Sequence, residues 1–97
     1  MAFVSIVTHK VKDYAAWKKV YDSVKGVQKE GGVRAHSVLR ASDDPNLVTV
    51  THTFDTLAAA QAFFSDNPAL KKAMVDAGVD VATMKLGFHE EVVSGAL

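Results

Sequence analysis

Two histidines in nearly identical surroundings are the side chains of this chain best suited to acid–base chemistry. The triplet Val-Thr-His occurs twice, ending at His9 and at His52, and a helix-like segment follows each copy. A neutral imidazole near pH 7 can take a proton from a substrate. If the triplets end two equivalent parallel strands, the histidines lie at the sheet edge where open α/β sheets usually bind ligands. The repeat therefore predicts a pocket that contains both histidines.

The expected arrangement is a close pair. On adjacent parallel strands at equal heights, the Cα atoms of His9 and His52 would be ~5 Å apart. Two imidazoles at that distance disfavour each other's protonation, so that one stays available as a general base. Such a base could remove a proton next to a carbonyl in an aldol-type cyclisation or a lactone isomerisation, or deprotonate a phenol that then reacts with oxygen. The alternative is structural: each histidine bonds a backbone group or a neighbouring side chain at a strand end.

Aromatic and cationic residues are expected around the same pocket. An indole and a phenyl ring would line it, a phenol could donate to a substrate oxygen, and a guanidinium could hold a carboxylate or phenolate. The residues in these roles are Trp17, Phe63, Tyr21 and Arg40. Each also has an ordinary interpretation, because the first three fall on apolar helix faces and Arg40 could pair with Asp43 or Asp44.

The other two histidines, His36 and His89, fall on expected edge strands and are interpreted as solvated or as part of a dimer interface. The sequence has no HxH, HxxxH or HExxH motif and no cysteine. Neither a metal site nor a disulfide is therefore expected. No cofactor-binding motif is present either, because Gly31 and Gly32 lack the surroundings of a phosphate-binding loop and serve to end a helix.

Length and charge restrict the class of protein. A chain of 97 residues with 48% hydrophobic content predicts one globular domain over residues 1–97. Eleven basic residues balance eleven acidic ones, which gives no indication of a nucleic-acid or anionic membrane partner. The first residues lack the basic and apolar regions of a signal peptide. A cytoplasmic location and a small-molecule ligand are expected.

Hydrophobic periodicity and breaker residues predict the secondary structure. Asp13 is the expected N-cap of the first helix, Asp55 or Thr56 that of the second, and Pro68 begins a further short helix after a break at residues 66–68. A polar turn over residues 42–46 makes the second and third strands a hairpin. Strands are expected over residues 3–11, 33–41, 47–54 and 83–92, and helices over residues 14–27, 57–64 and about 68–77.

This order predicts an α+β, ferredoxin-like β-α-β-β-α-β fold. We expect the first and third strands to be adjacent and parallel at the centre of the sheet, with the helices on one face. The other face would then expose the apolar side chains Val4, Ile6, Ala35, Leu39 and Leu47. An apolar sheet face of that kind usually marks an interface, so the chain is expected to form a homodimer in which two sheets pack together.

Four stretches of the sequence resemble small bacterial dimeric α+β barrel proteins of the antibiotic biosynthesis monooxygenase-like and cyclase-like type. The stretches are residues 9–18, 40–46, 54–60 and 72–79. The resemblance implies a homodimeric α+β barrel with a ligand cavity between the sheet and the helices of each monomer. Relatives of this type include cofactor-independent monooxygenases of aromatic polyketide pathways, haem-degrading monooxygenases, olivetolic acid cyclase and muconolactone isomerases. The residues of the haem-degrading subfamily are not matched here.

Together the residues and the resemblance predict a small cofactor-independent monooxygenase or cyclase that acts on an aromatic or polyketide-like molecule. His9 and His52 would be its acid–base pair. The alternative is a non-catalytic homodimer, a ligand-binding or stress-related protein in which the histidines are structural.

Overall fold

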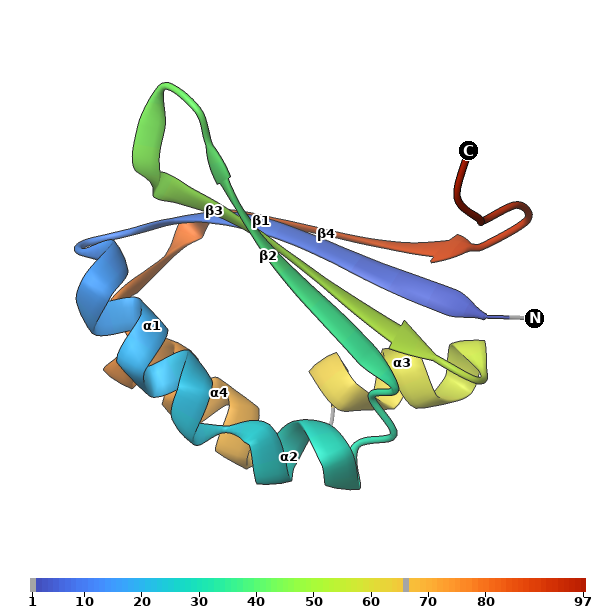
Figure 1. Cartoon of the computed structure of the whole chain (residues 1–97). Coiled ribbons are helices and arrows are strands. Elements are labelled where there is room, and N and C mark those ends of the chain that lie inside the picture. Colours follow the sequence, from blue (N-terminus) through green and yellow to red (C-terminus); the bar gives the residue numbers. More distant parts are fainter. Residues whose placement is uncertain (1, 66) are drawn as a thin grey trace.

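In the computed structural model, which describes residues 2–65 and 67–97, a sheet of four strands carries four helices on one face (Figure 1). None of these helices is long and apolar enough to cross a membrane. The α+β, ferredoxin-like fold is confirmed, with each of its two helical connections divided into two helices. The elements are β1 (Phe3–Val11), α1 (Tyr14–Ser23), α2 (Lys25–Glu30), β2 (Ala35–Ala41), β3 (Asp44–Phe54), α3 (Leu57–Ser65), α4 (Pro68–Asp76) and β4 (Val79–Glu90).

The expected parallel pairing of the two central strands is wrong. The strand order is β2-β3-β1-β4, and β1 runs antiparallel to both β3 and β4. The crossover through α1 and α2 makes β2 parallel to β1, and the tight hairpin then reverses β3. The carboxyl ends of β1 and β3 therefore lie at opposite ends of the sheet. In this register His9 stands opposite Val48, and His52 stands opposite Ser5.

The first helix is shorter than its apolar pattern predicts. Asp13 caps it as expected, because its carboxylate accepts the Ala16 N–H at 3.0 Å. At Val24, however, the backbone leaves the helical region with φ −100° and ψ 17°, and its N–H bonds to the Tyr21 carbonyl three residues back. A second helix, α2, then begins. The break brings Gln28, on α2, over the sheet as a buried side chain.

The hairpin between β2 and β3 is tighter than expected. Ala41 pairs with Asp44, so Ser42 and Asp43 alone make the turn and the predicted turn residues 44–46 belong to β3. The Asn46 side chain explains part of this difference, because its Oδ1 accepts the N–H of Tyr14 at 3.0 Å and ties the hairpin to the start of α1.

The helices in the second half of the chain begin at the capping residues that the sequence contains. Thr56 caps α3 through its hydroxyl, which accepts the Ala59 N–H at 3.1 Å, and Asn67 caps α4. Asp66, part of the predicted break, lies outside the described residues. β4 begins at Val79 rather than at residue 83, because Gly78 turns the chain with a positive φ of 75°.

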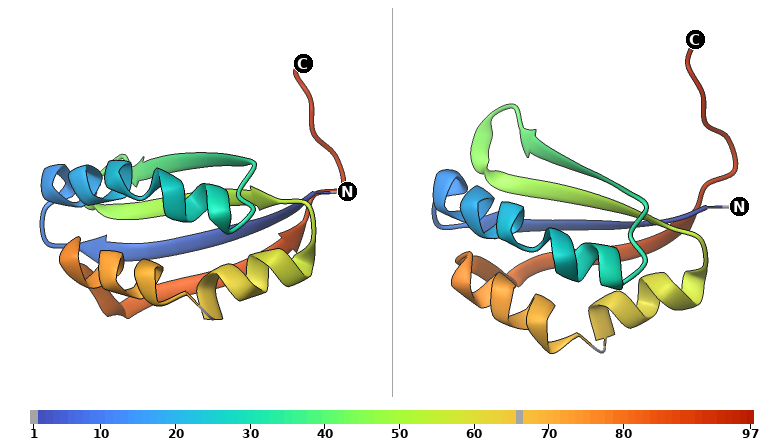
Figure 2. Two further views of the ribbon diagram at one scale, coloured as in Figure 1. Left: turned by 90° about the horizontal axis from the view of Figure 1, so that it is seen from below. Right: turned by 60° about the horizontal axis from the view of Figure 1, so that its bottom comes forward.

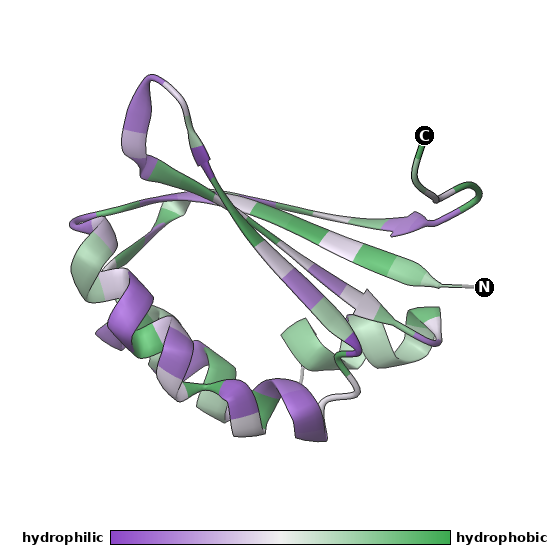
Figure 3. Ribbon diagram, in the orientation of Figure 1, coloured by the Kyte–Doolittle hydropathy of each residue, from purple (hydrophilic) through white to green (hydrophobic). Residues whose placement is uncertain are grey.

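Two apolar clusters fill the space between sheet and helices. Trp17 packs against valines of β1 and β3 in the larger cluster, and Phe54 packs against Phe63 and Ala60 in the smaller one. Both further views show α1 and α2 running beside α3 and α4 across the same face of the sheet (Figure 2). Buried residues alternate with exposed or half-buried ones along most of β1 and β3, as a sheet with one covered face requires. Hydrophobic residues occur on all four strands (Figure 3).

The face away from the helices, here called the outer face, carries the apolar residues expected there. Register places Val4, Ile6, Ala35 and Leu39 on it, and no helix of the described residues covers it. It is more polar than predicted, because β3 contributes threonines at alternate positions. Thr49 and its neighbour Thr8 share a hydrogen bond of 2.9 Å between their hydroxyls.

Gly31 is required for close packing of α2 against α3. A Cβ at this position would overlap the ring of Phe63. We predict that Gly31→Ala lowers the free energy of unfolding by about 1–3 kcal/mol, the usual cost of overpacking. At Gly26, within the same helix, a Cβ would meet nothing within 4 Å. Gly26→Ala should therefore raise stability by up to ~1 kcal/mol through helix propensity. Urea unfolding of both variants tests these two predictions. Equal changes in the free energy of unfolding would contradict the packing role of Gly31.

Candidate functional site

A small, half-open cavity lies between the sheet and the helices, and both histidines of the repeated triplet line it. Its volume is about 60 Å³. The wall combines sheet residues with helix residues, all of them apolar or aromatic apart from the imidazoles and one phenol: Val7, His9, Trp17, Tyr21, Val50, His52, Phe64, Leu70 and Met74. The side chains reach the cavity because alternate residues of β1 and β3 point to the helices.

His9 and His52 are not a close pair. His9 is opposite Val48, four residues along β3 from His52, so the two histidines are separated by about 13 Å along the strand direction. Mutual repulsion between them therefore cannot be what keeps either one neutral. The separation of the two histidines follows directly from the antiparallel pairing of β1 and β3. The two imidazoles instead stand at two ends of one cavity.

His9 is a buried imidazole with 4% exposure. Neither Nδ1 nor Nε2 has a hydrogen-bond partner among the described protein atoms. Its ring lies 6.1 Å from that of Trp17, between centroids. Burial lowers the pKa of His9, because the apolar surroundings disfavour its charged form. Both ring nitrogens of this neutral imidazole are thus free for a ligand.

His52 is as buried as His9, but it has a hydrogen-bond partner on α2. Its Nε2 lies 3.0 Å from Nε2 of Gln28, and its ring contacts those of Phe63 and Phe64. Burial lowers the pKa of His52 to about 4, with a smaller contribution from the nearby His36. Its Nδ1 has no partner among the described protein atoms. His52 is therefore neutral at pH 7 and presents one free nitrogen.

The histidine neighbour of His52 is His36 rather than His9. His36 on β2 stands directly opposite His52 on β3, and its Nδ1 lies 2.7 Å from the Tyr21 hydroxyl. Burial raises the pKa of Tyr21, which therefore keeps its proton. Sequence reasoning missed His36 because the parallel arrangement set His52 beside His9. The turn alone would not have revealed it, because a regular hairpin closed at residues 42 and 43 would pair residue 36 with residue 49. The register shift between Arg40 and Ala41 is what brings His36 opposite His52.

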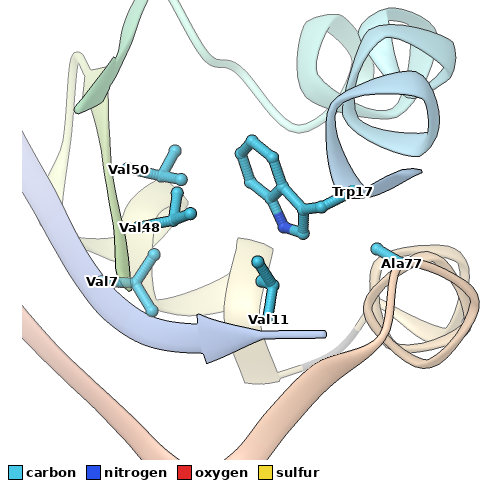
Figure 4. Packing of buried hydrophobic residues seen from close by; sticks show 6 residues of the cluster. All are labelled: Val7, Val11, Trp17, Val48, Val50 and Ala77. Carbon is cyan, nitrogen blue, oxygen red and sulfur yellow. The ribbon is translucent and has the colours of Figure 1, made fainter. Parts of the chain in front are cut away.

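The remaining predicted pocket residues divide into two groups. Trp17 and Tyr21 line the cavity, with their rings stacked at 4.9 Å between centroids. Figure 4 shows the Trp17 indole pointing from α1 into a group of valines. Phe63 is buried under α3 and touches His52, but Phe64 supplies the cavity wall in its place. Arg40 lies away from the cavity, with its guanidinium 4.4 Å from the centre of the Tyr14 ring.

A larger apolar cleft adjoins the histidine cavity. Its volume is about 290 Å³, and it lies between α4 and β4. Phe64, Leu70 and Met74 line both spaces, so these three side chains form the partition between them. Methionine changes rotamer readily, so movement of Met74 would join the two spaces. A small aromatic ligand would then have room beside the histidines.

A metal ion has no evident place here. In residues 2–65 and 67–97, no three His, Asp or Glu side chains come close enough together to hold one. The donors on the cavity wall are two separated imidazoles and a phenol. Their arrangement can bind, orient and exchange protons with an organic ligand.

Comparison with known proteins identifies the fold. The chain is similar to SnoaB, a cofactor-independent oxygenase from Streptomyces nogalater, with 14% identity, a TM-score of 0.77 and coverage of 96% of this chain and 95% of that one. A Bordetella bronchiseptica protein provisionally named an antibiotic biosynthesis monooxygenase gives 10% identity, a TM-score of 0.80, and coverage of 95% and 98%. Rv0793 from Mycobacterium tuberculosis gives 11% identity, a TM-score of 0.72, and coverage of 99% and 100%.

These similarities concern the fold alone, because every identity is 14% or lower. The chain has the α+β fold of the antibiotic biosynthesis monooxygenase-like proteins over nearly its whole length. The resemblance inferred from the sequence is confirmed at that level. No protein-family model matches the sequence, and no curated protein sequence does so either. At identities this low the similarity is one of fold, and the function has to be argued from the site.

Acid should destabilise the protein through His52. The unfolded imidazole binds a proton near pH 6.5, whereas the folded one does so only near pH 4. The unfolded state therefore holds more protons in this window, and the free energy of unfolding falls by about 3 kcal/mol from pH 7 to pH 4. His9 adds a change of the same sign. Urea unfolding at several pH values should show a shallower dependence of the unfolding free energy on pH for His52→Gln than for the wild type. Equal slopes in wild type and His52→Gln would contradict this.

Proposed function

We propose that this protein is a cofactor-independent monooxygenase or cyclase that acts on an aromatic or polyketide-like small molecule bound between the sheet and the helices. The observation that carries the proposal is the set of buried, unpartnered polar atoms in the apolar layer. Ser5 Oγ, both nitrogens of His9 and Nδ1 of His52 have no partner among the described protein atoms. Leaving such groups unsatisfied costs about 1–3 kcal/mol each, a cost that a polar ligand would remove.

In this function the imidazoles act on one ligand from separate positions. His9, neutral and with both nitrogens free, takes a proton from a phenol O–H or from a carbon next to a carbonyl. The electron pair stays on the ligand, either to attack a second carbonyl carbon or to react with molecular oxygen. Trp17 and Tyr21 form the aromatic wall against which a flat ligand packs. The fold shared with SnoaB agrees with this reading.

A homodimer formed through the outer face is the second part of the proposal. Ile6 and Leu39 are 37% and 53% exposed there. The row of threonines around them has short side chains that would let two sheets pack closely. The exposed Val92 and Val93 of the tail, which extends away from the helices (Figure 1), would add apolar contact with the partner.

One observation favours a non-catalytic alternative. The cavity between His9 and His52 holds only about 60 Å³, enough for a water molecule or two but not for an aromatic ring. If Phe64, Leu70 and Met74 never move apart, the histidines serve only the structure. The protein would then be a ligand-binding or stress-related dimer.

Loss of either imidazole should abolish turnover without loss of the fold. Removal of a general base, or of a preorganised donor to a developing negative charge, lowers the rate by about 100-fold or more. We therefore expect that effect on kcat/KM for His9→Ala and for His52→Ala. Oxygen uptake and product mass, measured with a panel of polyphenols and poly-β-ketones, give the readout. His89→Ala, on the outer face, is the matched control. Variants that unfold, or that keep full activity, would favour the structural alternative.

A charge on the outer face should separate the subunits. Ile6→Glu would bury a carboxylate between two sheets, which is unfavourable without a partner. Sedimentation velocity should show dimers for the wild type and monomers for this variant. Gln61→Glu places the same group on the exposed side of α3 and should leave the dimer intact. A wild type that sediments as a monomer would contradict the proposed assembly.

A further inference from the structure

Ser5 and His52 place two unsatisfied polar groups side by side in the centre of the sheet. They are direct partners in the β1–β3 register, and both point to the helix layer. Cβ atoms in such a pair are about 4.5–5.5 Å apart. Ser5 is fully buried at 0% exposure and His52 is buried at 4%. Neither Ser5 Oγ nor His52 Nδ1 has a partner among the described protein atoms.

Gln28 decides which nitrogen of His52 carries the proton. The atom of Gln28 that faces the ring is its amide nitrogen, 3.0 Å from His52 Nε2. An amide NH₂ can only donate, so Nε2 must accept and the neutral ring must carry its proton on Nδ1. The free nitrogen of His52 is thus an N–H donor. The Ser5 hydroxyl beside it is a second donor.

We propose that Ser5 and His52 form a two-donor subsite for a single ligand oxygen that gains negative charge, and that Gln28 is the positioning residue that keeps His52 in its donor form. Its ligands are molecules with an enolisable carbonyl or a phenol, whose oxygen becomes an enolate or phenolate oxygen. The catalytic meaning of the subsite rests on the proposed function, but the subsite itself is a property of the protein without substrate.

The subsite separates the roles of the two histidines. A proton leaves a ligand carbon or hydroxyl that is conjugated with the bound oxygen, and it binds a ring nitrogen of His9, whose two nitrogens are both free. The electron pair left behind is delocalised onto the ligand oxygen between Ser5 and His52. His52 itself neither gains nor loses a proton. Preorganised donors in an apolar layer stabilise such an oxyanion more than water-exposed donors do.

The side chains around the subsite favour an anionic oxygen over other ligand groups. No carboxylate lies among the described residues that line the cavity, and both its imidazoles are neutral, so a cationic ligand group would find no counter-charge there. A purely apolar ligand would leave both donors unsatisfied. An oxygen that accepts two hydrogen bonds removes both costs at once.

The tautomer of His52 provides the first test, and it needs no substrate. In ¹⁵N-labelled protein at pH 7, nitrogen shifts and two-bond couplings should show His52 as the Nδ1–H form. Gln28→Glu supplies an acceptor in place of the donor, so it should move the proton to Nε2. Gln28→Leu should give a mixture of the two forms. An Nε2–H tautomer in the wild type, or no change in Gln28→Glu, would overturn the role of Gln28.

The oxygen subsite provides the second test, with 4-nitrophenol as the probe and 4-nitrotoluene as the matched ligand that lacks the oxygen. The wild type should bind 4-nitrophenolate more tightly than neutral 4-nitrophenol. The visible spectrum would then show the bound 4-nitrophenol ionising at a lower pH than the free compound. Ser5→Ala should weaken phenolate binding about tenfold or more, the effect of one lost hydrogen bond to a charged group. Binding of 4-nitrotoluene should not weaken, and Ser37→Ala on β2 should change neither ligand.

The stability of Ser5→Ala keeps the test decisive. Replacing an unsatisfied buried hydroxyl by a methyl group should raise the Tm, so weaker phenolate binding cannot be attributed to unfolding. Unchanged phenolate binding in Ser5→Ala, or no preference for the phenolate over 4-nitrotoluene, overturns the subsite. If tautomer and binding agree but no panel compound is turned over, the subsite stands and the proposed enzymatic function falls.

Discussion

Backbone hydrogen bonds between β1 and β3 hold the centre of the sheet, and their antiparallel register decides which side chains become neighbours. Ser5 meets His52, and Val48 meets His9, because each strand alternates its residues between the helix layer and the outer face. A slip of one residue would move every one of these polar groups to the outer face. The apolar clusters around Trp17 and Phe54 prevent that slip, since it would expose valines and phenylalanines together with the histidines.

The helix layer adds a second constraint, because it removes water from groups that need hydrogen bonds. Most buried polar atoms in folded proteins have a partner, so four unpartnered atoms in the layer between the sheet and the helices represent a real loss of stability. A protein can carry that loss when the same atoms serve a ligand. Gln28 supplies a side-chain hydrogen bond to His52. It satisfies Nε2 of the ring and leaves Nδ1 free for a ligand. The break at Val24 brings it into place, because a straight helix would continue with a different orientation.

The similarity to SnoaB and to the Bordetella bronchiseptica protein concerns the arrangement of sheet and helices. Folds of this kind support several chemistries by changing the side chains that face the helix layer. In this chain those side chains are a serine, two imidazoles and an aromatic wall. In the proposed function, one flat molecule would lie between an oxygen-binding end at His52 and a proton-accepting end at His9. This requires Met74 to move, because the cavity between the histidines holds only about 60 Å³.

The sequence by itself determined the element types, most of the caps and the division of each strand into a buried and an exposed face. Periods of two and of about 3.6 residues carry that information locally, and Asp13 and Thr56 cap the helices from within a few residues. It also indicated that His9 and His52 share a face. Tertiary structure alone decided that they are far apart, that His36 and Ser5 flank His52, and that Gln28 reaches it. Those facts depend on the direction of β3 relative to β1 and on a helix break at Val24, which arise from contacts between residues distant in the chain.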